Sequence, residues 1–376
     1  MKLNLSFKKV LMTSVAALLG FATMSYAMPK GPKSVSRAVD NCEETSPGPF
    51  AFNYAKDIGL TCPSDFYAYG EFLLMLASED GLDYAITNNN GTENVPLTNG
   101  DVQGLSTGSH DLDWSKGFRI GFGFYMGHDA WNIDARWTYL RPRDQASAAV
   151  RNPTVLVPLH LTPSVNISQT NANASMKWRA KHNTLDLALG KPYHVSRLFI
   201  FNPFAGVRAT WLDQNMTYRY SGDINGHDGI KVHHSCDYWG VGLRGGAGSE
   251  YLLGAGWNLF ANLSMSMLYG KWNVTQNIPI ANAGIELDND FYGVTPNLEL
   301  ALGINWANFF AKNKYRIALS LAYEFQQWWK QNRTWRFYGD GSGAGAAATS
   351  GIASSSPVVH GDLAYNGFAF KLQLDF

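Results

Sequence analysis

Residues 257–269, with the sequence WNLFANLSMSMLY, decide the fold class. Every second residue is apolar: Trp257, Leu259, Ala261, Leu263, Met265, Met267 and Tyr269. The positions between them include Asn258, Asn262, Ser264 and Ser266. A period of two puts successive side chains on opposite faces of a β-strand. The segment therefore predicts a strand with one apolar face and one polar face, and with an aromatic residue at each end of the apolar face.

The same alternation recurs along the chain. Four further segments show it clearly: 118–126, 131–139, 298–306 and 315–325. Five less regular segments complete the set: 66–87, 177–190, 198–213, 237–250 and 363–376. In 177–190 the apolar positions change parity near Asn183, which we attribute to a β-bulge. The sequence thus predicts ten strands.

The connections between these strands alternate in length. Short ones lie near 127–130, 191–197, 251–256 and 307–314, and long polar ones near 88–112, 141–176, 214–236, 271–292 and 330–362. Short periplasmic turns and long extracellular loops are typical of a transmembrane up-and-down β-barrel with an even number of strands. A hairpin hidden in 141–176 would raise the number of strands to twelve or more.

The composition supports a membrane barrel. Charged residues make up 16% of the chain, against about 25% in soluble domains. No stretch after the extreme N-terminus is long and apolar enough for a transmembrane helix. In a bilayer, strands can span only as a closed sheet. Aromatic residues near the strand ends are expected at the level of the lipid headgroups: Trp131, Trp257, Tyr269, Trp306, Tyr315 and Tyr323. We therefore predict an all-β, antiparallel transmembrane barrel over 66–376.

The N-terminus predicts export. Three lysines precede the apolar run 10–24, and Ser25-Tyr26-Ala27 follows it. This is the pattern of a cleaved signal peptide, here 1–27. Residues 28–65 would then be a periplasmic extension or a plug. Localisation in a bacterial outer membrane follows, with outer-membrane lipid as surroundings. Net zero charge argues against nucleic acid as a partner.

Export permits disulfides. Cys42 and Cys62 lie in one proline-rich segment and are the candidate pair. Cys236 is then left over. It either pairs between chains, as an odd thiol in an exported protein can, or is merely a small residue at a strand end. We favour the second reading slightly and leave a homo-oligomer open.

The polar faces of the strands carry isolated charged residues. A charge facing lipid at the midplane costs about 2–4 kcal/mol, so we expect these side chains to line the lumen. They are Arg119, Arg136, Arg208, Arg244, Arg316, Asp134, Asp186, Glu299 and Glu324. Five basic and four acidic residues predict a lumen that carries both signs of charge and has weak ion selectivity. Alternatively, they pair into a network that plugs the barrel, since ten strands enclose a narrow lumen.

The chain ends in an amphipathic strand. Phe370, Leu372, Leu374 and the terminal Phe376 alternate with Lys371, Gln373 and Asp375. Such an ending resembles the signal that the outer-membrane assembly machinery reads, so we expect this machinery as a partner.

Several short stretches, in a specific order, carry a family resemblance. They are 77–85 (ASEDGLDYA), 137–139 (WTY), 185–190 (LDLALG), 202–208 (NPFAGVR), 238–242 (YWGVG), 323–329 (YEFQQWW) and the terminal strand. Together they resemble the Legionella-type family of pore-forming outer-membrane proteins over about 66–376. The resemblance implies an outer-membrane pore and no catalytic residues. Asn202 departs from it, because a basic residue is expected before Pro203-Phe204.

Two motifs suggest enzymes only superficially. Residues 240–245 match G-x-G-x-x-G, but the segment continues as a strand where a dinucleotide site needs a helix. Residues 104–108 match G-x-S-x-G, but lie in a loop where a nucleophile elbow needs a strained strand-to-helix turn. We read the first as close packing or lumen space and the second as a loop.

Two polar clusters are weighed in the same way. His227, His233, His234, Cys236 and Asp237 are of metal-ligand type, but adjacent histidines in a loop more often bind nothing, and we predict no metal and no cofactor. Asp111-Leu112-Asp113 resembles half of the site of ten-stranded outer-membrane proteases, and no D-x-H segment supplies the other half. We therefore expect no enzyme.

The sequence favours a pore that passes small hydrophilic solutes or ions through a polar lumen. A non-conducting structural or adhesive barrel is the alternative, because the predicted strand count is low and the loops are long. The two differ in whether the polar faces enclose water or a closed ion-pair network.

Overall fold

The computed structural model describes residues 65–89, 100–105, 113–126, 131–161, 172–222, 229–279, 284–335 and 358–376. The predicted signal peptide, the candidate pair Cys42 and Cys62, and the segment 28–65 apart from Asp65 lie outside these ranges. So do most of the G-x-S-x-G match and of the Asp111-Leu112-Asp113 segment. No helix in the described part is long and apolar enough to cross a membrane.

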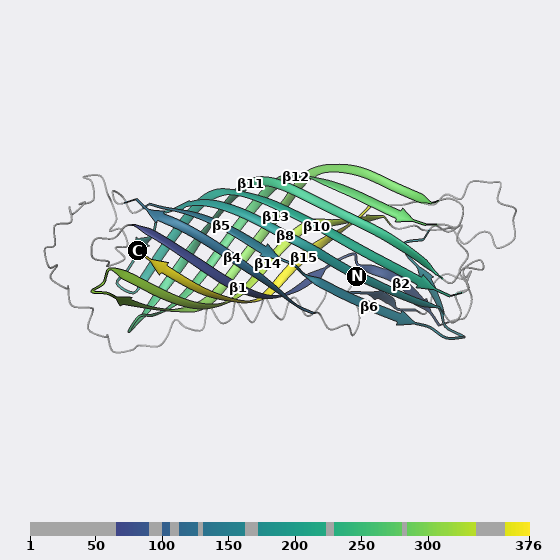
Figure 1. Cartoon of the computed structure of the whole chain (residues 1–376), viewed down its shortest axis with the longest axis horizontal. Coiled ribbons are helices and arrows are strands. Elements are labelled where there is room, and N and C mark those ends of the chain that lie inside the picture. The colour runs from purple at the N-terminus through teal and green to yellow at the C-terminus, as the bar shows by residue number, and fades with distance from the viewer. Residues whose placement is uncertain are drawn as a thin grey trace. The chain divides into compact units, whose positions relative to one another are not determined.

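Ten antiparallel strands close into a barrel (Figure 1). They are β1 (Phe66–Glu79), β4 (Trp114–Tyr125), β5 (Asn132–Leu140), β8 (Asn173–Gly190), β10 (Phe199–Ser221), β11 (Ile230–Gly254), β12 (Trp257–Ile278), β13 (Ile285–Phe310), β14 (Tyr315–Trp335) and β15 (Val358–Asp375). Sequential strands pair in this order, and the pairing of β1 with β15 closes the ring. The predicted all-β barrel is confirmed.

Segment 141–176, where a hidden hairpin would have raised the count, adds no further pair of strands to the barrel wall. β6 (Arg143–Ala149) pairs with β8, the same strand that pairs with β5. The pairing of β8 with β5 extends to His182, and its pairing with β6 begins at Arg179. Pro142 separates the two strands, and proline cannot donate to a ladder. β5 and β6 therefore act as one interrupted strand, and the count stays at ten.

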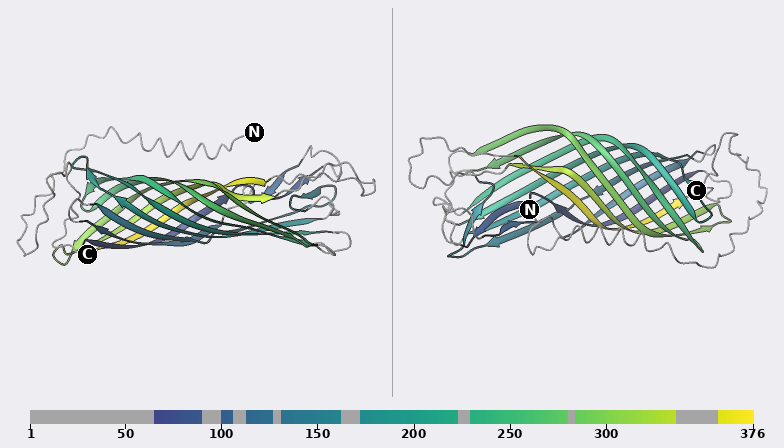
Figure 2. Two further views of the ribbon diagram at one scale, coloured as in Figure 1. Left: turned by 90° about the horizontal axis from the view of Figure 1, so that it is seen from above. Right: turned by 180° about the vertical axis from the view of Figure 1, so that it is seen from behind.

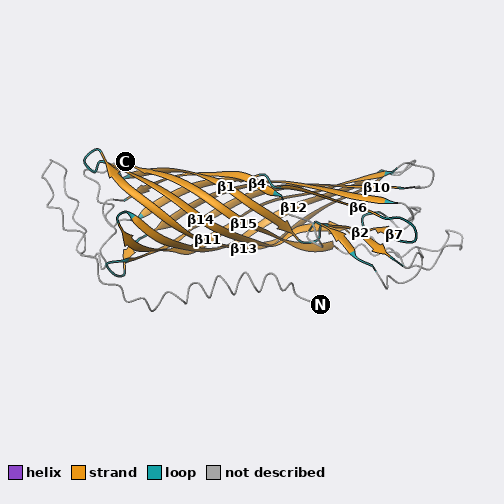
Figure 3. Cartoon of the chain, turned by 90° about the horizontal axis from the view of Figure 1, so that it is seen from below, coloured by secondary structure: helices purple, strands orange, loops and turns teal. Residues whose placement is uncertain are grey.

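Three short strands form a second sheet. β2 (Asp83–Asn88) pairs with β3 (Val102–Gly104) and with β7 (Val155–Pro158). β9 (Tyr193–His194) adds a short pairing to β10 at the opposite end. Figure 3 shows β2 and β7 at the end of the barrel far from the C-terminus. Since the C-terminus lies at the end with the short turns, this second sheet lies at the extracellular end.

Segment 66–87, expected as one strand, divides in two. β1 ends at Glu79, and a turn at Asp80-Gly81 leads into β2. Gly81 has φ 83°, in the left-handed region that glycine adopts readily. The turn removes β2 from the wall and carries it to the second sheet.

The strands are longer than the sequence pattern predicts. β10, β11, β12 and β13 continue well into the stretches 214–236 and 271–292, which were expected to be loops. Figure 2 shows these long, strongly inclined strands from two sides. The loop assignment was wrong there because the outward face stops being apolar, although the backbone remains paired.

β8 shows how the polarity of its two faces inverts. Leu185 and Leu187 point outward and are exposed, whereas Trp178, on the inward face of the same strand, is fully buried. The outward positions farther along carry Lys177 and Arg179. Where lipid surrounds the barrel the outer face is apolar; beyond the bilayer the outer face meets water, and the apolar side chains pack inside.

The predicted β-bulge near Asn183 is therefore wrong. β8 runs from Asn173 to Gly190 in unbroken register with β10. The apolar residues change parity because the environment changes, not because a residue is inserted.

The apolar outer belt has the thickness of a bilayer. On β12 it runs from Trp257 to Tyr269, which both point outward and are exposed. Twelve residue steps of about 3.3 Å span about 40 Å along the strand. At a tilt of about 45° this is about 28 Å along the barrel axis, close to the apolar band of outer-membrane barrels.

Candidate functional site in the barrel lumen

The nine charged residues proposed from the sequence lie on inward faces of the strands. Arg119 illustrates the geometry: it is 5% exposed, and its neighbour Ile120, on the other face of β4, is 51% exposed. The strands contribute them as follows: Arg119 from β4, Asp134 and Arg136 from β5, Asp186 from β8, Arg208 from β10, Arg244 from β11, Glu299 from β13, and Arg316 and Glu324 from β14.

Arg208 lies at the centre of the larger charge cluster. Its guanidinium donates to both carboxylate oxygens of Asp186, at 2.6 and 2.9 Å. Its Nη1 is 2.6 Å from Glu299 Oε1. Arg208 is 1% exposed. Buried charges of this kind are stable only when they are paired and hydrogen-bonded.

Two further arginines share the same carboxylates. Arg136 Nη2 is 2.6 Å from Asp186 Oδ2, and Arg244 Nη2 is 3.0 Å from Glu299 Oε2. The strand register explains the first contact, because Arg136, Asp186 and Arg208 stand opposite one another on β5, β8 and β10. Three arginines thus enclose two carboxylates in the middle of the lumen.

Arg119 forms a second cluster on the other side of the lumen. Its two terminal nitrogens donate to the two carboxylate oxygens of Glu324, at 2.9 and 3.0 Å. It also contacts Glu71, which stands directly opposite it on β1. A bidentate arginine–carboxylate pair fixes both side chains in one geometry.

Arg316 and Asp134 take part in smaller contacts outside these clusters. Arg316 Nη1 donates to Asp375 Oδ2 at 3.0 Å. Asp134 accepts hydrogen bonds from the hydroxyls of Tyr67 and Tyr69, at 3.0 and 3.1 Å.

Sequence reasoning missed four charged residues that line the large cavity or form an ion pair beside it. They are Glu71, Glu250, Lys371 and Asp375. Lys371 and Asp375 had already been placed opposite the apolar face of the last strand, so parity alone could have found them. Glu71 was harder to find, because the outward positions before it on the same strand carry Ala68 and Gly70 instead of large apolar residues.

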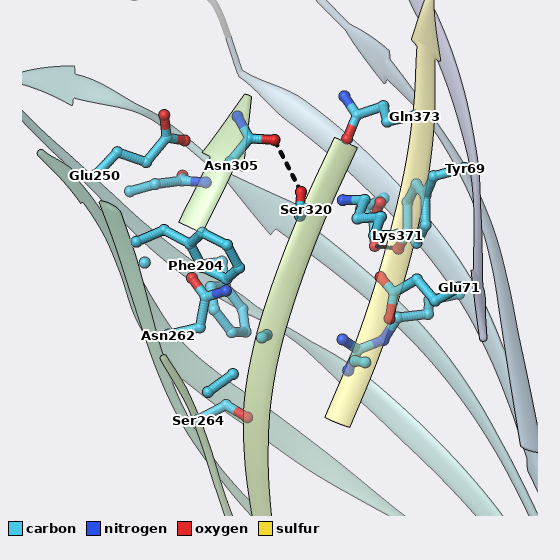
Figure 4. A pocket seen from close by; sticks show the side chains of 18 of the residues that line it. Tyr69, Glu71, Phe204, Glu250, Asn262, Ser264, Asn305, Ser320, Lys371 and Gln373 are labelled. Carbon is cyan, nitrogen blue, oxygen red and sulfur yellow. Dashed lines mark hydrogen bonds between the residues drawn. The ribbon is translucent and has the colours of Figure 1, made fainter. Parts of the chain in front are cut away.

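A cavity of about 320 Å³ lies next to these ion pairs (Figure 4). Its lining extends to Tyr125, Gly190 and Gln373, all at strand ends on the short-turn side. The cavity therefore lies on the periplasmic side. Five basic residues line it, Arg119, Arg136, Arg244, Arg316 and Lys371, and five acidic ones, Glu71, Asp134, Glu250, Glu299 and Glu324. Hydroxyl and amide groups such as the hydrogen-bonded pair Ser320 and Asn305 complete a polar surface.

The lumen narrows beyond the ion pairs. A pocket of only about 10 Å³ remains there, between the charges and His182. His182 Nδ1 lies 3.2 Å from the hydroxyl of Tyr365 and its ring meets Trp328 edge to face. Tyr365, Trp328, Leu73 and Trp178 are all buried. These side chains form an apolar plug across the described part of the barrel.

The second sheet packs against the inner wall above this plug. The Tyr220 hydroxyl donates to the backbone oxygen of Tyr84 at 2.7 Å, and the rings of His160 and Tyr218 stack 3.9 Å apart. Since Tyr218 and Tyr220 point inward from β10, β2 and β7 lie inside the wall there. Together with the plug, they occupy the extracellular side of the described lumen.

The superficial motifs do not form sites. Residues 240–245 are part of strand β11, and a Cβ on Gly242 would lie 1.9 Å from the backbone oxygen of Met267. This glycine serves close packing. His227 lies outside the described residues. His234 points inward and His233 outward, so these two members of the candidate metal-type cluster do not converge. No group of three or more candidate ligands for a metal occurs among the described residues.

Cys236 is a free thiol inside the barrel and is fully buried. It lies within β11, six residues after the first residue of the strand, rather than at a strand end. Its burial makes it inaccessible to a second chain in this conformation.

A closed, ten-stranded barrel with an apolar belt of bilayer thickness and a polar interior defines the class: this is a β-barrel of the bacterial outer membrane. The chain belongs to the family described as Legionella pneumophila major outer membrane protein precursor, whose model matches residues 64–376. A comparison with curated proteins finds no match.

Solved barrels resemble the chain only distantly. The P. putida toluene transporter TodX is 10% identical, with 83% of this chain and 90% of that one covered and a TM-score of 0.28. The monoaromatic hydrocarbon channel CymD is 8% identical, with coverages of 84% and 89% and a TM-score of 0.30. A Pseudomonas aeruginosa FadL homologue is 8% identical, with coverages of 83% and 89% and a TM-score of 0.25. Likenesses at this level carry no argument about function.

Proposed function

We propose that this chain is a channel that passes small hydrophilic solutes or ions across the outer membrane by diffusion, without catalysing a reaction. The observation that carries the proposal is the polar cavity of about 320 Å³ inside the membrane belt. A barrel that serves only as a scaffold gains more from filling its interior with apolar side chains, because buried ion pairs contribute little net stability.

The ion pairs around Arg208 and Arg119 act as the gate of this channel. They separate the periplasmic cavity from the narrow pocket beside His182. Only side chains make these contacts, and the strands behind them stay paired. A change of side-chain rotamers therefore opens the charged constriction without breaking the wall. Displacement of the plug and of the second sheet completes the path.

Conductance of the refolded protein in planar bilayers tests the proposal. Glu299→Gln keeps the shape of the side chain and removes the charge that attracts Arg208 and Arg244, so we expect more frequent opening. Glu286→Gln is the matched control, because Glu286 lies on the outward face of the same strand. The absence of conductance steps above the lipid background, in both the wild type and Glu299→Gln, would reject the channel.

A non-conducting structural or adhesive barrel is the second candidate. The apolar plug and the second sheet favour it, because both lie across the extracellular side of the lumen. Liposome swelling with small sugars separates the two candidates. Swelling supports diffusion through the lumen, whereas rigid liposomes together with preserved binding to host surfaces support adhesion.

A further inference from the structure

The outer wall of the barrel carries a continuous row of basic side chains above the apolar belt. We call it the basic patch and define it by five residues: Arg143 on β6, Lys177 and Arg179 on β8, Arg219 on β10 and Lys231 on β11. All five point outward and are exposed. They lie far apart in the sequence, and only the strand register brings them together.

The register sets two like charges directly opposite each other twice. Arg143 faces Arg179 across β6 and β8, and Arg219 faces Lys231 across β10 and β11. Lys177 lies between the two pairs on the outer wall. On one side it is two residues from Ser175, which faces Arg219. On the other side it faces Gln145, which is two residues from Arg143. Directly opposed like charges destabilise a sheet. An anion bound between them would remove that cost.

No acidic side chain of the described chain forms an ion pair with this patch. Asp144 belongs to β6 but points inward. Asp213 points outward nearer the membrane and faces Lys181 across the two strands. Because Lys181 has this acidic neighbour, we leave it out of the patch. Burial, together with the charges of Lys231 and Arg219, lowers the pKa of His233. The charges that act on His233 are therefore basic.

Another part of the outer wall carries mainly negative charge. The outward positions of β13 at a comparable distance from the belt carry Glu286, Asp288 and Asp290. A general need for solubility would not sort the two signs in this way. The patch instead has the composition of a surface that meets an anionic partner.

Its height above the membrane indicates which partner. Arg143 lies four residues past Tyr139 of the apolar belt, and Lys231 lies eight residues past Trp239. At about 3.3 Å per residue and a tilt of about 45°, this places the patch about 9–19 Å beyond the hydrocarbon. The headgroup layer of a phospholipid is only about 5–8 Å deep. A lipid whose phosphates sit on a thicker, sugar-based headgroup fits this height.

We propose that the basic patch binds the phosphate groups of a phosphorylated glycolipid in the outer leaflet. Arginine recognises phosphate with two parallel hydrogen bonds, and three of the five residues are arginines. The acyl chains of the same lipid would lie along the apolar belt directly below. This site is on the outer wall and is independent of any transport through the lumen.

The test compares lipid binding by the full-length protein in detergent, measured by native mass spectrometry. The double variant Arg143→Gln/Arg179→Gln should bind a bisphosphorylated glycolipid roughly thirtyfold more weakly, the change expected from losing two basic contacts with an anionic surface. Lys312→Gln/Lys314→Gln removes the same charge from the exposed turn between β13 and β14, on the periplasmic side, and should bind like the wild type. The melting temperature without lipid checks that both variants are folded.

Other outcomes overturn the proposal. Equal binding of the dephosphorylated glycolipid would mean that only the acyl chains matter. Equally tight binding of inorganic phosphate would assign the patch to free phosphate. Tighter binding of an anionic phospholipid than of the glycolipid would contradict the argument from the height of the patch. Loss of an oligomer in the arginine variant, with lipid binding unchanged, would assign the patch to a second copy of the chain.

Discussion

Arg208 and Asp186 stand directly opposite each other on β10 and β8 and are joined by two hydrogen bonds, at 2.6 and 2.9 Å. Both are almost completely buried. Asp186 also pairs with Arg136, so one carboxylate compensates two guanidinium groups.

Asp186→Asn should therefore destabilise the barrel strongly. The amide keeps the shape but leaves Arg136 and Arg208 without their shared charge, and breaking a buried pair costs about 3–5 kcal/mol. Denaturant unfolding in lipid vesicles measures the change. Asp290→Asn is the control, because its pair with Lys271 is exposed on the outer wall and should contribute little. Equal effects of both variants would contradict a special role of the central cluster.

Lys371→Glu should shift the ion selectivity of the channel towards cations. Lys371 lines the cavity, where five basic residues balance five acidic ones, and the change leaves four basic against six acidic residues. The reversal potential in a salt gradient measures the selectivity. Lys312→Glu, in the exposed turn between β13 and β14, should leave the potential unchanged. A shift of equal size in both variants would mean that the cavity does not lie on the ion path.

The contribution of Glu79 to stability should fall as the pH rises from about 4.5 to 8. Burial raises the pKa of Glu79 to about 8 from its ordinary value of 4.5, and this residue lies beyond the membrane belt at the end of β1. The folded state thus retains a proton that the unfolded state loses, and this contribution is full below pH 4.5 and disappears above 8. Glu79→Gln should remove this contribution, so that the melting temperature of the wild type minus that of the variant falls between pH 4 and 9. A constant difference would argue against this role of Glu79.

Gly242→Ala should impair folding. A Cβ there would meet the backbone oxygen of Met267 at 1.9 Å, whereas one on Gly245 of the same strand would be 3.8 Å from its nearest neighbour. Crowding of this kind costs about 1–3 kcal/mol. Refolding yield into detergent, followed by the heat-dependent shift in electrophoretic mobility, should fall for Gly242→Ala and not for Gly245→Ala.

Phe376→Ala should reduce insertion into the outer membrane. Phe376 ends the final amphipathic strand, whose outward face also carries Phe370, Leu372 and Leu374. Phe309→Ala removes an exposed aromatic residue from the same periplasmic end and serves as control. Fractionation of cells that express each variant measures the inserted protein. Normal insertion of Phe376→Ala would show that this residue is not needed for assembly.

Much of the membrane-embedded barrel was predictable from alternation. On β4, Arg119 points inward and Phe118 and Ile120 outward, as a period of two requires in lipid. The number of barrel strands followed from counting the segments. These features depend only on each strand and its solvent.

The partners and the strand ends were not predictable. Which carboxylate meets Arg208 depends on the stagger between β8, β10 and β13, which no single strand encodes. The ends of β8 and β12 were missed because the strands leave the bilayer, and the rule of an apolar outer face then fails. The inward turn at Gly81 depends on contacts with β10, which lies more than a hundred residues away.

The continuation of β12 past Tyr269 has a consequence for what reaches this protein from outside the cell. Nine more residues lead to Ile278, or about 21 Å above the hydrocarbon at the same rise and tilt. The connecting segments therefore begin beyond the reach of ordinary lipid headgroups. An antibody, a bacteriophage or another cell would touch this raised rim before it touched the membrane.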